Sequence, residues 1–133
     1  MHVLEHLPNP VEYLQALRTK FLEPTGWLLL EVPNLFAHDS FEFAHLVSFS
    51  AHTLTQVVKK AGFRIVQLRL HGLPRSRLIP LYITLLAQPN GSTSSETEPD
   101  RMVRLQRQIG FFRRRLAERI SPRHAWIPIN EIE

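Results

Sequence analysis

Apolar residues early in the chain recur every three or four positions, which is the pattern of a helix with one face on a core. The positions that share this spacing are Val11, Leu14, Leu17 and Phe21. Just before them, Asn9 is placed as an N-cap, with Pro10 at the first helical position and Glu12 at the third. The sequence therefore predicts a helix that starts at Pro10 and ends before the Pro-Thr-Gly turn at 24–26.

Three later segments read as strands. The nearly continuous apolar run from Trp27 to Val32 predicts a strand that is buried on both faces, as in parallel sheets. Residues 63–70 and 78–87 follow, and the short connection between them predicts an antiparallel hairpin. The opening residues 2–4 read as the end of a further buried strand that runs into the first helix.

Between the first strand and the hairpin, the sequence predicts a loop and a second helix. Ser50 is placed to cap this helix, and Gly62 to end it. The loop over 34–49 contains four phenylalanines, at 36, 41, 43 and 49, although loops are mostly polar. Such a loop is expected to cover something, as a lid over a pocket does. Alternation of strands and helices predicts an α/β fold with a partly parallel sheet.

The last third of the chain has a different character. Residues 89–99 read as a linker, and a helix of about 20 residues is expected from Asp100 onward. Its apolar seam consists of Met102, Leu105, Ile109, Phe112, Leu116 and Ile120. Three interpretations remain open: the seam docks on the domain, it pairs with another copy as a short coiled coil, or the helix binds phosphate or nucleic acid. The expected division is 1–88, 89–99 and 100–133.

Charge and composition narrow the function classes. The net charge is +4, but residues 1–88 hold eight Lys/Arg against six Asp/Glu, so the basic character belongs mostly to the seven arginines between 101 and 119. Nucleic-acid binding is therefore not expected of the body of the chain. There is no cysteine, hence no disulfide or thiolate site. No apolar run approaches the roughly 20 residues that a membrane helix needs, and the N-terminus does not resemble a signal peptide. A cytoplasmic location without membrane contact is the expectation.

Two blocks of the sequence stand out: HVLEHLPNPVEYLQALRTKFLEPTGWLLLEVPN and FEFAHLVSFSAHTLTQVVKKAGF. Together they resemble the second half of class I S-adenosylmethionine-dependent methyltransferases of the type 11/12 group. The resemblance covers residues 1–88 and departs from the family at Thr25, where a glycine is usual. It implies a partial Rossmann-like sheet with strands equivalent to 4-5-7-6, flanking helices and an additional C-terminal helix.

The resemblance also implies what the residues would do. Val3, Leu4 and Glu5 would border the cofactor S-adenosylmethionine, while His6 and His45 would be catalytic. In sugar C-methyltransferases the histidine of the second block is proposed to help deprotonate the substrate, although here Ala44 replaces the usual Glu. An imidazole suits general base chemistry near neutral pH. The structural alternative is that Glu5 caps the next turn, His6 packs beneath the helix, and His45 anchors its own loop by hydrogen bonds.

The glycine-rich turn that holds the family's cofactor has no counterpart, since the five glycines form no G-x-G cluster. We therefore expect this chain to be part of a methyltransferase and to be inactive alone. The substrate of the intact enzyme is expected to be an unidentified small molecule, with a sugar as one candidate. The alternative is a non-enzymatic interaction module that forms a homodimer through the sheet edge or the C-terminal helix. No histidine pair combines i,i+4 helix spacing with carboxylate support in the manner of a helical metal motif, so no metal site is expected.

Overall fold

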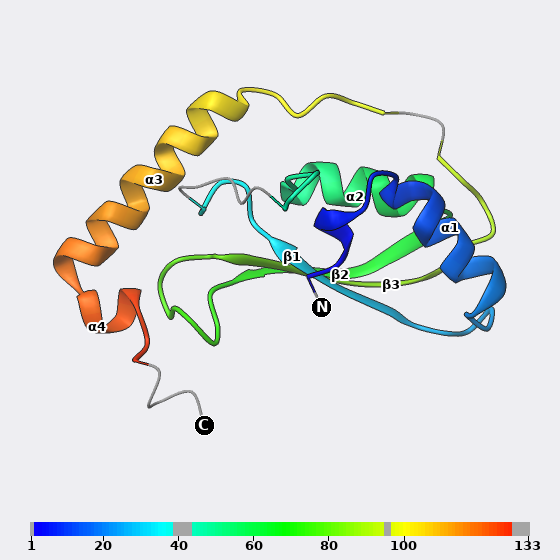
Figure 1. Ribbon diagram of the computed structural model, residues 1–133, viewed down its shortest axis with the longest axis horizontal. Coiled ribbons are helices and arrows are strands. Elements are labelled where there is room, and N and C mark those ends of the chain that lie inside the picture. The colour runs from blue at the N-terminus through cyan, green and yellow to red at the C-terminus, as the bar shows by residue number, and fades with distance from the viewer. Residues whose placement is uncertain (1, 39–43, 95–96, 129–133) are drawn as a thin grey trace.

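The computed structural model describes residues 2–38, 44–94 and 97–128 (Figure 1). The elements follow the expected order: a 3-10 turn η1 (Leu4–His6), α1 (Pro10–Lys20), β1 (Leu28–Pro33), α2 (Ala51–Lys60), β2 (Phe63–His71), β3 (Tyr82–Pro89), α3 (Val103–Ile120) and α4 (Pro122–Ala125). The predicted N-caps are confirmed, because Asn9 accepts from the backbone of Glu12 and Ser50 forms a capping box with Thr53.

The three strands form one sheet in the order β1-β3-β2, and β3 is antiparallel to both neighbours. The predicted hairpin of β2 and β3 is thereby confirmed. β1 and β2 run in the same direction but do not pair with each other, because β3 lies between them. This is the order in which the resemblance places the last three family strands, although the described part of the chain contains no parallel strand pair.

The predicted strand at residues 2–4 is wrong. Val3 has helical dihedral angles (φ −120°, ψ −37°) and begins the 3-10 turn, in which the amide of His6 donates to the Val3 carbonyl. A residue with helical ψ cannot continue a sheet ladder. One backbone hydrogen bond, from His2 to the Glu31 carbonyl (3.3 Å), links the N-terminal segment to the edge of β1.

The hairpin connection is longer than predicted, since β3 begins at Tyr82 instead of Leu78. Pro80 has no N–H for a ladder hydrogen bond, and residues 72–81 fold back in turns instead. Ile79 and Leu81 are buried there in a small second core with Ala37, Tyr82 and Ala125.

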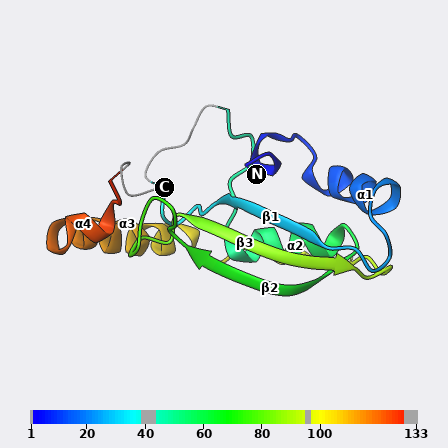
Figure 2. The same ribbon diagram turned by 90° about the horizontal axis from the view of Figure 1, so that it is seen from below.

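The sheet buries one face only. Leu28, Leu30 and Val32 pair with Ala87, Leu85 and Ile83 on the side of the main core, where α2 packs with Leu54 and Val58. Figure 2 shows α2 behind the sheet and no helix among the described residues on the near side. The expectation that β1 is buried on both faces is therefore wrong, and Leu29 is 55% exposed.

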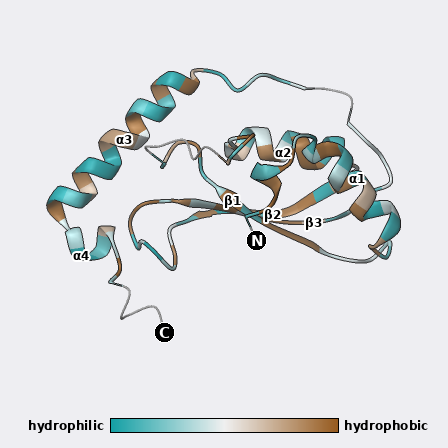
Figure 3. Ribbon diagram, in the orientation of Figure 1, coloured by the Kyte–Doolittle hydropathy of each residue, from teal (hydrophilic) through white to brown (hydrophobic). Residues whose placement is uncertain are grey.

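Helix α3 stands apart from the sheet (Figure 1) and carries alternating polar and apolar turns along its length (Figure 3). Its closest approach is at Gly110, where a Cβ would lie 1.9 Å from the Phe36 carbonyl oxygen. Arg114 donates to the Ala37 carbonyl on the same side (3.2 Å). The predicted seam lies mainly elsewhere: all of Met102, Leu105, Ile109, Phe112, Leu116 and Ile120 are exposed. The helix thus docks through its glycine and arginine side, not through the seam.

The segment that joins β3 to α3 runs alongside α2. The backbone amide of Glu98 donates to the Gln56 side chain, and the Glu98 carbonyl accepts from that side chain (both 2.9 Å). The Ser50 hydroxyl donates to Asp100 (2.5 Å). No helix of the described residues combines the length and apolar character that crossing a bilayer requires.

Candidate functional site

The loop after β1 folds back onto the turn that contains Glu5 and His6. Its two ends meet, because the amide of Leu35 donates to the Phe49 carbonyl (2.8 Å). From this loop, the amide of Val47 donates to the Glu5 carbonyl (3.0 Å), and the Ala44 carbonyl lies 2.8 Å from His6 Nδ1. Residues 39–43, with the expected lid residues Phe41 and Phe43, lie outside the described part of the chain.

This fold-back brings together the two histidines that the resemblance selects. The rings of His6 and His45 lie edge to face with their centroids 4.8 Å apart. One ligand atom of each of Glu5, His6 and His45 lies within 4.8 Å of the others. His6 is exposed and His45 half-buried, so both can be reached from solvent.

Glu5 is the unusual member of this cluster. It is 1% exposed, and neither carboxylate oxygen has a hydrogen-bond partner among the described residues. The nearest ion-pair neighbour is His2, whose Nδ1 lies 3.3 Å from Oε1. A buried carboxylate without hydrogen bonds is energetically costly. The predicted alternative was that the Glu5 side chain caps the next turn. No hydrogen bond among the described residues supports it.

A small cavity of about 20 Å³ opens beside Glu5 and His45. Asn34, His38 and Arg107 also line it. Its size suits a single water molecule or ion. Residues from the loop after β1 and from helix α3 thus both line the cavity next to the Glu5/His6/His45 cluster.

A second polar group lies on the uncovered face of the sheet. The Thr84 hydroxyl donates to Glu31 (3.1 Å), and His71 Nε2 lies 2.6 Å from the same hydroxyl and 3.3 Å from the carboxylate. His2 Nε2 approaches the other Glu31 oxygen at 3.3 Å. Since the Thr84 hydrogen points to Glu31, the Thr84 oxygen accepts from Nε2–H of His71.

Tyr82 lies at the centre of this second group. The rings of His2, His38 and His71 surround it at centroid distances of 5.3, 6.4 and 5.7 Å. Burial raises the pKa of Tyr82 above its ordinary value of 10.0; the positive charge of Arg75 opposes this rise and the negative charge of Glu31 adds to it. The phenol is therefore held in its neutral, proton-donating form.

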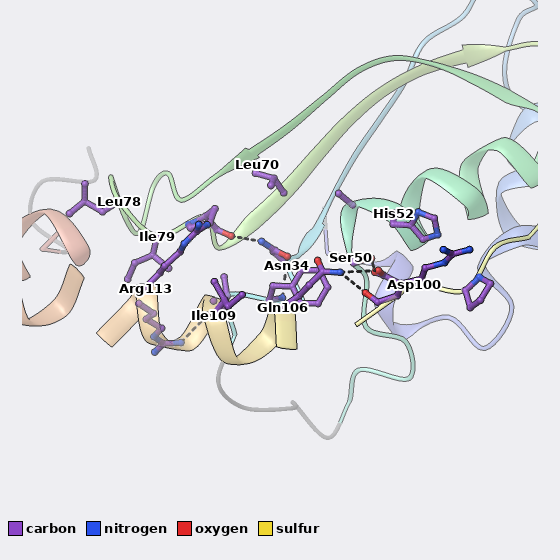
Figure 4. A pocket seen from close by; sticks show the side chains of 18 of the residues that line it. Asn34, Ser50, His52, Leu70, Leu78, Ile79, Asp100, Gln106, Ile109 and Arg113 are labelled. Carbon is purple, nitrogen blue, oxygen red and sulfur yellow. Dashed lines mark hydrogen bonds between the residues drawn. The ribbon is translucent and has the colours of Figure 1, made fainter. Parts of the chain in front are cut away.

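A larger cavity of about 900 Å³ separates α3 from the sheet and the start of α2 (Figure 4). Its polar wall includes Asn34, Ser50 and Asp100, and its apolar wall includes Leu70 and Ile79. Asn34 lines both cavities and is held in place by donation to the Pro80 carbonyl (2.8 Å). Cavities of this size hold small organic molecules in many proteins.

The three residues expected at the cofactor do not form a complete cofactor site. Leu4 is buried in the main core, and the side chain of Val3 is exposed and aliphatic. Glu5 alone offers a polar group, and that group is covered. Together they lack the backbone cradle and the ribose-binding carboxylate that a dinucleotide-type site uses. Val3, Leu4 and Glu5 by themselves therefore do not make up an S-adenosylmethionine site.

Sequence reasoning missed the group around Tyr82. Its members come from the N-terminal segment, the loop after β1 and all three strands, and no local spacing links them. One signal was present: Glu31 interrupts the apolar run of β1 at a position that alternates with the buried residues. A charged residue in that place indicates an accessible or paired side chain. The antiparallel register was needed to identify Thr84 opposite it.

The sequence of the chain was also compared with known protein families. The model of a methyltransferase domain matches residues 1–68, which include both blocks of the resemblance and the Glu5/His6/His45 cluster. The chain belongs to this methyltransferase domain family, as the sequence motifs predict. No curated protein matches the chain.

Proposed function

We propose that the chain provides the acceptor side of an S-adenosylmethionine-dependent methyltransferase. Membership of the methyltransferase domain family supports the general activity. The observation that carries the finer proposal is the contact of His6 with His45, because it joins the two blocks of the family pattern at one point. In this proposal β1, β3 and β2 correspond to family strands five, seven and six.

His6 and His45 would hold and deprotonate the methyl acceptor. The Ala44 carbonyl holds the proton of His6 on Nδ1, which leaves a lone pair on Nε2. His45 packs against the same ring and lines the cavity beside Glu5. Removing a proton from an acceptor hydroxyl, amine or activated carbon raises its reactivity toward an electrophilic methyl group. The histidine pair supplies that proton acceptor.

The acceptor itself would occupy the cavity between α3 and the sheet. Its volume of about 900 Å³ suits a small molecule, and Asn34 lines both this cavity and the smaller one beside His45. Hydrogen-bonding groups such as Asn34 and Ser50 favour a hydroxylated ligand, with a sugar as one candidate. S-adenosylmethionine would supply the methyl group, and its glycine-rich cradle would come from residues other than these 133.

The first test is calorimetry of the chain with S-adenosylmethionine. Because the described residues lack a cradle, we expect no binding in the micromolar range. Such binding would overturn the assignment of the cofactor site to other residues. The DNA upstream of the Met1 codon and the proteins that copurify with the chain are then searched for a V-L-[DE]-x-G-x-G-x-G segment.

The second test uses the chain joined to the protein or segment that carries that motif. Transfer of a radiolabelled methyl group to a panel of small hydroxylated acceptors is measured for the natural chain, His45→Ala and His6→Ala. We expect a loss of about 100-fold in kcat for each variant, and an unchanged rate for His124→Ala, whose imidazole contacts Ser121 in the C-terminal segment. Equal rates in all four proteins would remove the histidine pair from the mechanism.

The non-enzymatic alternative has one specific observation in its favour. The seam of α3 is exposed along its whole length, with Phe112 at 67% and Ile120 at 72%. A short coiled coil between two copies would cover it. Sedimentation of the chain with and without Leu105→Glu tests this: a dimer that the substitution dissociates supports the interaction module, and a monomer at all concentrations contradicts it.

A further inference from the structure

We propose that Glu5, His6 and His45 bind one divalent transition-metal ion, of the class represented by Zn²⁺ and Co²⁺. The three residues present one carboxylate and two imidazoles, with one ligand atom from each within 4.8 Å of the others. Such a donor set leaves a coordination position free for water or a ligand oxygen, as in catalytic metal sites. The helical spacing rules that gave no expectation of a metal site do not apply, because His6 and His45 meet only in the folded chain.

The independent observation that points to a cation is the state of Glu5. Its carboxylate is 1% exposed and both oxygens are without hydrogen-bond partners among the described residues. Burying a carboxylate costs several kcal/mol unless a positive charge or hydrogen bonds compensate. His2, at 3.3 Å, is charged only when protonated and is shared with Glu31. A bound divalent cation would neutralise Glu5 directly.

The surroundings of His6 match those of a metal ligand. The Ala44 carbonyl lies 2.8 Å from Nδ1 and therefore accepts the ring proton from that nitrogen. Nε2 is then unprotonated and has its lone pair free to bind a metal. Ligand histidines in metalloproteins are oriented in this way by a carbonyl or carboxylate behind the ring. The same carbonyl comes from the residue that precedes His45, so one short segment positions both imidazoles.

The size of the cavity and the types of ligand atom together indicate which ion would bind. The cavity beside Glu5 and His45 measures about 20 Å³, enough for one ion or water. Ligand atoms around tetrahedral Zn²⁺ lie roughly 3.3 Å apart, given bond lengths of about 2.0–2.1 Å. Metal binding would therefore draw the three ligand atoms, which lie within 4.8 Å of one another, to about this spacing. Imidazole nitrogen favours zinc, cobalt and related ions over Mg²⁺ and Ca²⁺, which prefer oxygen ligands.

Arg107, which lines the cavity, opposes the binding of a cation there. It reaches the cavity from α3 and also lies over the Phe111 ring, 5.0 Å from its centroid. Its positive charge would weaken metal binding without preventing it, since two imidazoles and a carboxylate supply the bonds. Arg107→Gln is therefore expected to tighten metal binding severalfold, while a ligand substitution weakens it.

The metal proposal does not rest on methyl transfer. Metal binding is measured in the chain alone, without S-adenosylmethionine, so its failure leaves the proposed function untouched.

As a proton acceptor in methyl transfer and as a metal ligand, His6 would use the same lone pair on Nε2. A bound ion would convert His6 from a proton acceptor into a ligand, and a chelator then distinguishes the two states in any later activity assay.

The experiment is titration of the full chain with Co²⁺, followed by visible absorption and competition with Zn²⁺. We expect saturable ligand-field bands at one equivalent, displaced by Zn²⁺ and insensitive to Mg²⁺. Glu5→Gln and His45→Ala should each weaken binding about tenfold or more. His124→Ala is the matched control, because it removes an imidazole from the C-terminal segment. Circular dichroism verifies that each variant is folded.

His45→Ala decides the outcome if Glu5→Gln disturbs the core, because His45 is a half-buried loop residue. Loss of the bands in folded His45→Ala, with binding retained in His124→Ala, supports the site. The proposal is overturned if the natural chain gives no saturable bands, or if His45→Ala binds Co²⁺ as tightly as the natural chain.

Discussion

Glu31 on β1 and His71 on β2 lie 3.3 Å apart, although a complete strand separates their backbones. The hydroxyl of Thr84 on that middle strand joins them, since it donates to Glu31 and lies 2.6 Å from His71. A polar row therefore crosses all three strands on the face that no described helix covers. Charged hydrogen bonds of this kind link the strands independently of the apolar core on the other face.

Removing the charge from Glu31 should destabilise the sheet. Glu31→Gln loses the anionic acceptor for Thr84 and the ion pairs with two histidines. We expect a decrease of about 1 kcal/mol in the free energy of unfolding, reduced from the value for a buried pair because Glu31 is 20% exposed. Urea unfolding measures it. Glu23→Gln, at an exposed turn position, is the control and should change stability little.

The stability of the fold should fall in alkaline solution because of Tyr82. Its pKa is raised in the folded protein, chiefly by burial, so the folded state holds the phenolic proton more tightly than the unfolded state does. This contribution is complete below the ordinary pKa of 10.0 and is lost as the pH rises through the folded-state value. Tyr82→Phe should remove this alkaline loss, whereas Tyr13→Phe, at a 43% exposed position, should retain it.

Ultraviolet titration of the two tyrosines tests the cause of the shift. Glu31→Gln should lower the pKa of Tyr82 and Arg75→Gln should raise it, following the signs of the two charges. An alkaline unfolding curve that is identical in Tyr82→Phe and the natural protein would contradict the assignment.

Gly110→Ala should release α3 from the domain. Alanine favours a helix over glycine by about 1 kcal/mol, so α3 itself should become more helical. The new Cβ would lie 1.9 Å from the Phe36 carbonyl oxygen, a distance that forces the helix away. Because the chain has no cysteine, spin labels on Lys59→Cys and Arg115→Cys report the separation directly. We expect a longer and broader distance distribution for Gly110→Ala.

Gln108→Ala provides the control for that experiment. It places an alanine on the same helix at an exposed position, and because Gln is already a good helix former the gain in helix propensity is small. Its distance distribution should match that of the natural chain. A Gly110→Ala distribution that also matches would show that the contact with Phe36 does not hold α3.

Arg18 and Gly62 should be energetically coupled. Arg18 on α1 donates to the Ala61 carbonyl at the end of α2 (3.0 Å), and a Cβ on Gly62 would lie 2.8 Å from its Nε. Gly62→Ala should cost roughly 1–2 kcal/mol for the left-handed backbone (φ +87°) and more for displacing Arg18. When Gly62→Ala is made in the Arg18→Ala variant, only the free-energy cost of the left-handed backbone remains. A double-mutant cycle in urea should therefore give less than the sum of the single effects, and strict additivity would contradict the contact.

Local signals in the sequence were sufficient for the helices and for the hairpin. Asn9, Ser50 and Gly62 mark helix ends through interactions within a few residues, and the structure has them in these roles. Residues 2–4 could not be assigned in the same way. An apolar Val-Leu pair suits a strand and a 3-10 turn equally, and the helical ψ of Val3 selects between them.

The candidate site was predictable in part for the same reason. The family pattern selects Glu5, His6 and His45 one by one, but their mutual contact depends on the return of the loop through Val47. The isolation of the Glu5 carboxylate is a property of packing, which no spacing rule reports. The seam of α3 had the correct helical period, yet Gly110 and Arg114 determine which side docks, because only glycine allows the close approach to Phe36.

The central place of β3 has a consequence for synthesis of the chain on the ribosome. Leu28 and Phe63 enter their ladders only when Ala87 and Pro89 have been made, because β1 and β2 pair with β3 and not with each other. The segment that matches the methyltransferase domain ends at residue 68, before β3 begins. A nascent chain of that length carries β1 and the first part of β2 without their common partner strand, and unpaired strand edges favour aggregation. Sheet formation therefore waits for the last strand to emerge.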